Sequence, residues 1–392
     1  MSARSVDAAA PVFSLIDDPL LRLQRALRLT PRKGFGAVRR ALAAMVVTWV
    51  PIVVWAATSG HLNAADRSDP FLRHLGIHVR CLIAIPLMIL SEPVANWVIG
   101  AIVGNFVPSG LIRPEDRERF HAVIQSVERW RDSIVLWGVL LLTIVLRTVV
   151  IGRVWGNEDL DSLTWANGST LLDFGGAWAL YVVRPLFLFL LLVWLWRLIL
   201  TWVLFRRIAR LDLQLIPSHP DRVGGLGFLE YHSVAFGLVV LAISSVVAAA
   251  VAHQILSHDA TLKQYQYPLL VLVGLLVVLF LLPLTSFQSR LRRTNLRARF
   301  EYGTLAGRHV RGLHQRWIEG RAVEDDILSA PEIGPAADVQ TLYGMGTQMK
   351  VAPIGKVQIG AILLPAAVPL VFLLGLEVPI TEVLMKLLQA LT

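Results

Sequence analysis

The sequence predicts an all-α polytopic membrane protein with about seven transmembrane helices, its N-terminus in the cytoplasm and its C-terminus outside. Three observations lead to this prediction. Hydrophobic residues make up 55% of the 392-residue chain. They gather in seven apolar stretches, each of roughly the length that crosses a bilayer as a helix. The loops between these stretches alternate between many and few Lys and Arg residues, as the loops of multi-span proteins do.

The predicted spans follow from length. A helix rises about 1.5 Å per residue, so about 20 mostly apolar residues cross about 30 Å of hydrocarbon. The seven stretches lie at residues 41–58, 77–104, 133–152, 177–205, 232–256, 268–287 and 357–377. The first is short, and the second and fourth are long, which indicates tilt, kinks or extension beyond the membrane.

The orientation follows from the basic residues, because positively charged loops stay on the cytoplasmic side. The segments that we predict to be cytoplasmic contain 28 Lys and Arg residues, whereas those on the opposite side contain 5, and a reading with six spans would break this alternation. The chain then divides into a cytoplasmic arm with an amphipathic helix (1–40), a six-helix transmembrane region (41–287), a basic cytoplasmic helical segment (288–356), and a seventh helix with a short outer tail (357–392).

The same asymmetry explains the overall charge. The formal net charge is +9 and the isoelectric point is about 10.2. In a soluble protein these values would suggest a nucleic-acid partner. Here topology accounts for them, so we expect no nucleic acid. We expect the lipid bilayer itself, and anionic lipid head groups attracted to the basic inner face over about a Debye length, to be the partners instead.

The N-terminal arm contains one predicted helix. Asp18-Pro19 is typical of a helix start and Thr30-Pro31 of its end. Leucines lie on one face of this helix and arginines largely on the other. The helix therefore either lies in the inner membrane interface or packs on the cytoplasmic loops, and both readings make it an anchor rather than a reaction centre.

The segment 288–356 is the largest soluble piece. It begins with the basic stretch RLRRTNLRARFEYGTLAGRHVRGLHQRW, which we expect to continue the sixth span as a helix. About 70 residues are too few for an independent enzyme core. The segment is therefore either a docking surface for a cytoplasmic protein partner or a solvated helical hairpin.

The most distinctive string is RLDLQLIPSHPDRVGGLGFLEYH, residues 210–232, whose Pro and Gly content predicts a shaped turn. Exposed glycine amides beside an arginine would hold an anion or a lipid head group. The residues of that candidate site are His219, Asp221, Arg222, Gly224, Gly225 and Gly227. A metal bound by His219, Asp221, Glu230 and His232 is a second reading, and a purely structural re-entry into the membrane is the third.

Several strings resemble those of a group of uncharacterised bacterial multi-span membrane proteins. They are VRCLIAIPLMILSE (79–92), WLWRLILTW (194–202), the HPDRVGGLGFL turn, and the Pro-rich last span with its Leu-rich tail. The resemblance implies a shared architecture and supplies no activity. The composition and the compact loops indicate the bacterial inner membrane as the location.

Three arginines fall inside the outer half of the predicted spans. By helical rise, Arg80, Arg147 and Arg184 lie about 5, 8 and 10 Å below the outer surface. An ionisable group at that depth is a functional candidate. If the three converge, they form an electropositive vestibule that concentrates anions. The alternative is snorkelling and pairing with acidic outer loops.

Glu92 in the second span lies at a depth similar to that of Arg197 in the fourth. Glu92 is followed by Pro93, and Pro86 comes two turns earlier, so this helix is expected to be kinked. Interrupted helices hold ion and proton sites in transporters. The interpretation is either an ion pathway or a kinked helix with a buried Glu92–Arg197 pair.

Histidines on the outer side offer a further reading. His74 and His78 have i,i+4 spacing, and His253 ends the fifth span at a similar level. Copper, zinc or haem would need such ligands. Because no HExxH string and no haem-attachment cysteine pair accompanies them, a metal here is the less favoured reading, and we expect no cofactor.

Nucleophile elbows, paired catalytic carboxylates and nucleotide fingerprints are absent from the sequence. The leading prediction is a channel or transporter for a small ion, with Glu92 and Arg197 in its pathway. The alternatives are a non-conducting scaffold or sensor that acts through residues 288–356 and, third, a membrane enzyme acting on lipid-linked substrates. Small residues at every fourth position of the fifth span predict close packing within the subunit or in a homo-oligomer.

Overall fold

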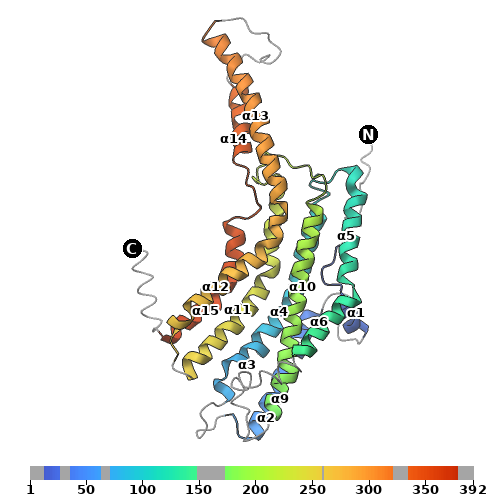
Figure 1. Ribbon diagram of the computed structural model, residues 1–392, viewed down its shortest axis with the longest axis vertical. Helices are drawn as coiled ribbons and strands as arrows, with labels where there is room; N and C mark the ends of the chain where they lie inside the picture. Colours follow the sequence, from blue (N-terminus) through green and yellow to red (C-terminus); the bar gives the residue numbers. More distant parts are fainter. Residues whose placement is uncertain are drawn as a thin grey trace.

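The computed structural model describes residues 13–26, 36–62, 71–147, 173–257, 260–320 and 334–377. Within these ranges every regular element is a helix, so the all-α prediction is confirmed. Figure 1 shows a bundle of roughly aligned helices from which one helical pair projects at one end.

Six helical runs are long and apolar enough to cross a membrane. They are α2 (Ala37–Thr58); Leu75–Asn105, made of α3 (Leu75–Val79), η2 (Arg80–Ala84) and α4 (Ile85–Asn105); Phe174–Ile208, made of α9 (Phe174–Trp178), η6 (Ala179–Val183) and α10 (Arg184–Ile208); Gly227–Ser257, made of η7 (Gly227–Tyr231) and α11 (His232–Ser257); the run from α12 (Leu262–Leu281) through η8 (Leu282–Phe287) into α13 (Gln288–Trp317); and α15 (Lys356–Glu377). This set of helices has the lengths and composition of an integral membrane protein.

The predicted span at residues 133–152 is described only in part. It begins as α6 (Ile134–Leu146), an apolar helix of 13 residues, and the chain is described as far as Arg147. Residues 148–152 lie outside the described ranges. The count of seven spans and the orientation of the termini therefore stay predictions.

The remaining helices lie around this bundle. In the described ranges they are α1 (Pro19–Ala26), η1 (Phe71–Arg73), η3 (Pro114–Asp116) and α5 (Arg117–Arg131), whereas α14 (Gly334–Thr347) lies beyond the bundle against α13. The polar helix α5 buries Phe120, Ile124 and Val127, three or four residues apart, on the face that packs against α10. The run that ends in α10 has 35 residues, or about 52 Å, so it extends well beyond a bilayer core of about 30 Å.

Helix α11 forms the centre of the bundle and packs most extensively on α15 and α4. Its small residues are buried, as the spacing predicts: Ser244 donates a hydrogen bond to the carbonyl of Ala366 in α15, and Ala248 is 6% exposed. Small side chains let two helix backbones approach closely, and a polar hydroxyl adds a bond across the contact. The described contacts place this packing within the subunit.

Two of the long runs contain a single π turn in corresponding positions. In η2 the N–H of Ile85 bonds to the carbonyl of Arg80, and in η6 the N–H of Arg184 bonds to that of Ala179. A proline follows one residue after each of these donors, and its missing N–H interrupts the regular i−4 ladder. The expected irregularity of the second span is therefore a π turn before Pro86, whereas α4 continues through Pro93.

The projecting pair consists of α13 and α14 (Figure 1). Helix α13 continues α12 and η8 without an interruption of helical structure, and its 30 residues extend for about 45 Å. Helix α14 returns along it in close contact: a Cβ atom added to Gly346 would come within 2.9 Å of the Tyr302 ring. The segment 288–356 thus contains a helical hairpin, which we call the α13–α14 hairpin.

Candidate functional site

The N-terminal segment before α1 inserts into the bundle. Phe13, Leu15 and Ile16 are at most 2% exposed. The side-chain oxygen of Asn96 in α4 accepts hydrogen bonds from the Ser14 hydroxyl at 2.9 Å and from the Leu15 N–H at 3.0 Å. These contacts carry the chain into the interior and place Asp18, 2% exposed, among the helices.

The helix that follows, α1, is fixed by charge. Arg25 pairs with Asp17 at 2.6 Å, and Arg22 pairs with Asp132 at the end of α5 at 2.8 Å. The start at Pro19 agrees with the sequence prediction, whereas the predicted end at Thr30-Pro31 lies outside the described residues. The described part of α1 therefore packs against the protein, at the end of α5.

Arg197 in α10 lies at the centre of a buried charge network. Its guanidinium donates to Asp18 Oδ2 at 2.8 Å and to Glu92 Oε1 at 3.0 Å. The second oxygen of Glu92 accepts a hydrogen bond from Arg40 in α2. The side chains of Asp18, Glu92 and Arg197 are 3–4% exposed and that of Arg40 is 9% exposed. The network contains two carboxylates and two guanidinium groups, so its formal charge is zero.

Aromatic packing holds the central arginine in place. The guanidinium carbon of Arg197 lies 5.0 Å from the centroid of the Trp194 ring, one turn earlier on α10. The indole N–H of Trp194 in turn donates to the carbonyl of Met88 in α4 at 3.0 Å. A cation over an aromatic face is stabilised electrostatically, most strongly where water is excluded. The pair of helices α4 and α10 is therefore joined both by charge and by an indole.

The network lies near one end of the membrane region rather than in its middle. Arg40 occupies the first turn of α2, whose 22 residues are about the length that crosses a bilayer core. A salt bridge from that turn fixes Glu92 at the level where α2 begins. This end of the bundle is the one that the distribution of basic residues predicts to be cytoplasmic.

The four charged residues bring together the N-terminal segment and three helices. Each carboxylate oxygen of Asp18 and Glu92 accepts at least one hydrogen bond: Asp18 Oδ1 also caps α1 by accepting from the N–H of Leu21 at 2.9 Å. The Arg197 Nε atom is buried and has no hydrogen-bond partner among the described residues. Breaking one member of such a set leaves an uncompensated buried charge, which is costly.

The chain matches no family model, no curated protein and no solved structure.

The outer arginines do not repeat this arrangement. The Arg80 guanidinium lies over the ring of Phe187 at 5.5 Å from the centroid, so it contacts the helix that carries Arg184. Arg147 is exposed at the end of the described part of α6. The predicted vestibule stays a prediction, and its best-placed members are Arg80 and Arg184 on neighbouring helices.

The Asp221 carboxylate organises the Gly-rich turn. Its Oδ1 atom accepts from the N–H groups of Val223 at 2.9 Å and Gly225 at 3.2 Å, and its Oδ2 atom accepts from the N–H of Gly227 at 2.8 Å. The His219 Nδ1 atom lies 2.9 Å from Oδ1. Two of the three glycine amides that the sequence offered to an external anion, those of Gly225 and Gly227, are thus bonded to a carboxylate of the turn itself.

The backbone and the electrostatics of the turn agree with this reading. Gly224 and Gly225 have φ angles of +71° and +97°, which favour glycine. Burial of the Asp221 carboxylate raises its pKa, but the three backbone N–H groups and His219 lower it by more, so the pKa lies below its usual value. The charged Asp221 carboxylate thus stabilises the turn through hydrogen bonds from the turn's own backbone.

The turn also connects the bundle to the α13–α14 hairpin. The carbonyl of Arg222 accepts from the N–H of Lys350 at 2.7 Å, just beyond α14. The Asn295 side chain in α13 donates to the carbonyl of Met349 at 2.7 Å, and Gln358 in α15 donates to Glu230 at 3.3 Å. Turn, hairpin and last span are thus joined by hydrogen bonds that the sequence does not reveal.

The outer histidines separate into two environments. The ring centroids of His74 and His253 lie 4.1 Å apart, and the two rings meet edge to face. His78 instead accepts a hydrogen bond from the Trp49 indole at 3.1 Å, and its other ring nitrogen lies 3.1 Å from the carbonyl of Phe71. Among the residues described, no group of three or more His, Cys, Asp or Glu side chains has a metal-binding arrangement, including those of the Gly-rich turn.

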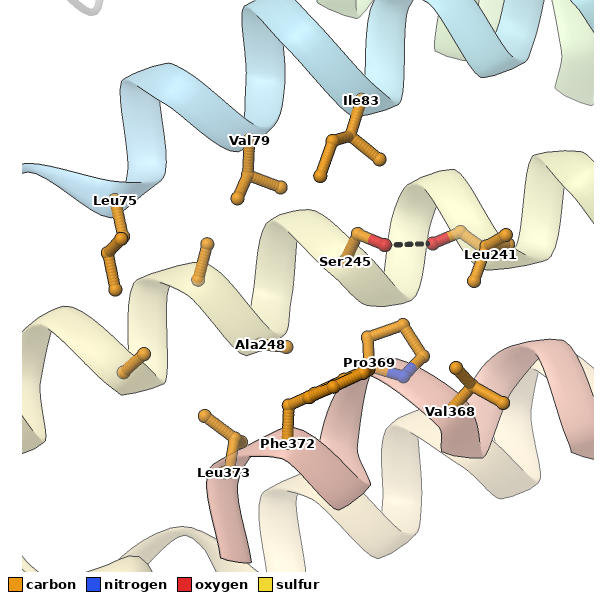
Figure 2. A pocket seen from close by; sticks show the side chains of 12 residues that line it. Leu75, Val79, Ile83, Leu241, Ser245, Ala248, Val368, Pro369, Phe372 and Leu373 are labelled. Carbon is orange, nitrogen blue, oxygen red and sulfur yellow. Dashed lines mark hydrogen bonds between the residues drawn. The ribbon is translucent and has the colours of Figure 1, made fainter. Parts of the chain in front are cut away.

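An apolar groove lies between α3, α11 and α15 (Figure 2). Its volume is about 330 Å³, and it is lined by aliphatic side chains together with Pro369 and Phe372. The one hydroxyl in the labelled lining, that of Ser245, donates to the carbonyl of Leu241 at 2.7 Å, so its proton is already used within α11. The groove suits a hydrocarbon chain and no charged substrate.

Proposed function

We propose that this protein is an integral membrane scaffold or sensor that acts through the α13–α14 hairpin. The observation that carries the proposal is an exposed apolar stripe on α13. Leu296, Phe300, Val310 and Trp317 are 56–69% exposed. At about 100° per residue they fall within about 100° of one another around the helix. An apolar stripe on a projecting, water-facing helix is typical of a protein–protein contact.

The partner that fits this stripe is an amphipathic helix with acidic flanks. Arg293, Arg297 and Arg308 alternate with the stripe along α13, and all three are exposed. Apolar anchors at helical spacing give affinity in such contacts, whereas the surrounding charges steer the encounter. Ala298, which faces α14 and is 1% exposed, lies on another side of α13 and is already covered.

The neutral network supports the same proposal. If Glu92 and Arg197 lined a conducting pathway, their side chains would have to exchange with water or with the transported ion. Here Glu92 is paired on both oxygens and Arg197 is paired with two carboxylates at 3–4% exposure. That arrangement is the one expected of charges that lock helices together.

A small-ion channel or transporter is the second candidate, and one observation favours it. The N-terminal segment closes the bundle beside Glu92, and polar bonds through Asp18 and Asn96 contribute to holding it there. Release of this segment would uncover the Glu92–Arg197 pair, as the opening of a gate does. The network would then be the closed state of a pathway.

Two measurements separate the candidates. The first is flux of chloride, potassium and protons in liposomes that contain the full-length protein, compared with Glu92→Gln and Arg184→Gln. If the protein is a scaffold, the flux of each ion should equal that of empty vesicles for the wild type and for both variants. Flux that changes with either substitution, in folded protein, would contradict it and establish the pathway.

The second measurement is photo-crosslinking in cells from a benzophenone side chain placed at Phe300 or, as a matched control, at Leu305. Both residues are apolar and exposed on α13, but they lie about 140° apart around the helix. The scaffold predicts one discrete crosslinked partner from position 300 only. Equal labelling from both positions would contradict a defined contact surface.

A further inference from the structure

A second cavity lies where the end of α10 meets η8 and the start of α13. Its volume is about 450 Å³. Four arginines line it together with hydroxyl groups and the Trp202 ring, and its lining contains no Asp or Glu. The lining residues used below are Arg206, Arg210, Arg290, Arg293, Ser286 and Trp202. We call this cavity the arginine cleft.

The charges of the arginine cleft are not balanced by the protein. Arg290 is held by the end of α10, because it donates to the carbonyls of Ala209 at 3.0 Å and Arg210 at 2.9 Å. Arg206 lies over the Trp202 ring at 5.4 Å. In the ranges that the structure covers, no carboxylate lies within salt-bridge distance of Arg206, Arg210 or Arg293. Guanidinium groups gathered in this way are what binding of a phosphate requires.

A neighbouring cavity shows what a balanced site looks like in the same chain. It has a volume of about 620 Å³ and shares Arg290 and Arg293 with the arginine cleft. Its own arginines are paired: Arg113 lies 3.4 Å from Asp212, and Arg297 lies 3.6 Å from Glu301. The absence of acidic residues is therefore a property of the arginine cleft and not of the whole basic surface.

A buried hydroxyl supplies an independent observation. The Ser286 Oγ atom lines the arginine cleft, is buried, and has no hydrogen-bond partner among the described residues. The adjacent Thr285 hydroxyl, in contrast, donates to the carbonyl of Leu282 at 2.7 Å. A buried polar atom without a partner is destabilising unless a ligand or water satisfies it.

The position of the cleft selects the source of the anion. The apolar helix α12 ends at Leu281, and Leu282, which is 41% exposed, borders the cleft. Trp202 lies at the same place, as tryptophans do at the level of lipid head groups. Basic pockets between spanning helices at the cytoplasmic side bind phospholipid head groups. We propose that the arginine cleft binds the phosphate of an anionic phospholipid, with Arg206, Arg210 and Arg293 on the phosphate oxygens and the Ser286 hydroxyl as a further donor.

The test uses the full-length protein in a neutral detergent, titrated with short-chain phosphatidylglycerol and followed by native mass spectrometry. The double variant Arg206→Gln/Arg210→Gln is expected to bind about 25-fold more weakly, about fivefold for each charge. The matched control Arg113→Gln/Arg297→Gln removes two charges from the neighbouring cavity and is expected to bind within about threefold of wild type, because these two arginines are already paired with Asp212 and Glu301. Ser286→Ala keeps every charge and should weaken binding about fivefold, which tests the site even if the double variant fails to fold.

Three outcomes would overturn the proposal. Equal losses in the double variant and the control would show attraction to the basic surface as a whole. Unchanged binding in the folded double variant, or in Ser286→Ala where the double variant does not fold, would remove the site. Displacement of phosphatidylglycerol by inorganic phosphate at equal concentration would assign the cleft to a soluble phosphate. Short-chain phosphatidylcholine, which has the phosphate but no net charge, is expected to bind at least tenfold more weakly than phosphatidylglycerol.

Discussion

The Asp18 carboxylate and the Arg197 guanidinium, 179 residues apart in the chain, form a 2.8 Å ion pair inside the helical bundle. The same carboxylate caps α1 through the N–H of Leu21. One side chain thus begins a helix outside the spans and neutralises an arginine within one. The position of the N-terminal segment and the packing of α10 depend on each other.

Removing Arg197 is expected to cost more than removing Asp18. Arg197→Gln leaves two buried carboxylates with one cation, which should lower the free energy of unfolding by about 3–5 kcal/mol. Asp18→Asn breaks one ion pair rather than two and leaves Arg197 paired with Glu92, so it should lower this free energy by less, about 1–3 kcal/mol. Thermal unfolding in detergent of both single variants and the double variant measures the coupling, which we expect to be about 0.5–3 kcal/mol. Strictly additive effects would mean that the two groups do not interact.

The inserted N-terminal segment predicts protection of Leu15 from reagents in water. In a background in which Cys81, the only cysteine, is replaced by Ala, Leu15→Cys should react with a membrane-impermeant maleimide at least tenfold more slowly than Ser109→Cys. Ser109 is exposed in the loop after α4, on the side that we predict for both residues. Adding Asp18→Asn should speed labelling at position 15. Equal rates at positions 15 and 109 would show that the segment is not inserted.

Periodicity and charge predicted most of the fold. Apolar stretches revealed the six spanning runs, because a bilayer requires long apolar helices whatever their neighbours are. Glu92 and Arg197 were placed at similar depth, and they are in contact. Asp18 and Arg40 were missed as their partners. Both lie in a charged arm of the sequence where pairing depends on a fold-back of the chain, and only the acidic residue at a helix start hinted at Asp18.

Asp221 should make stability depend on pH in the acidic range. Because its folded pKa lies below the unfolded value, the charged carboxylate stabilises the fold above about pH 4, and this contribution is lost as pH falls further. Asp221→Asn should lower the free energy of unfolding by about 1–3 kcal/mol at pH 7. The difference in Tm between wild type and variant, followed from pH 7 to pH 3, should shrink. A Tm difference that stays constant from pH 7 to pH 3 would show that the charge of Asp221 is not the cause of the lost stability.

Gly175 allows α9 to contact α2. A Cβ atom added there would overlap the ring of Trp55, so Gly175→Ala should lower the free energy of unfolding by about 1–3 kcal/mol through overpacking. Gly138 in α6 is the matched control, since an added Cβ atom meets nothing within 4 Å. Gly138→Ala should be neutral or stabilising by up to about 1 kcal/mol. Thermal unfolding of the two variants measures this, and equal losses would rule out the contact as the cause.

The turn around Asp221 shows why sequence reasoning about sites reaches a limit. The string HPDRVGGLG contains acceptors, donors and flexible backbone that fit an anion site, a metal site or a shaped turn. The direction of one carboxylate decides between these three. The Asp221 carboxylate accepts hydrogen bonds from the N–H groups of Val223, Gly225 and Gly227, which favours the shaped turn. The arginine cleft was missed for the opposite reason: its arginines come from segments about 80 residues apart that only the fold brings together.

The helical run from α12 to α13 contains 54 residues from Leu262 to Gln315, about 20 of them before η8. Tilting is one way in which a spanning helix accommodates a change in bilayer thickness. Because α13 extends for about 45 Å beyond the span, a change in tilt of about 10° would displace its far end sideways by about 8 Å. A small change in the tilt of α12 is thus amplified at the far end of the α13–α14 hairpin. The distance between this end and a bound partner would therefore depend on the thickness of the membrane.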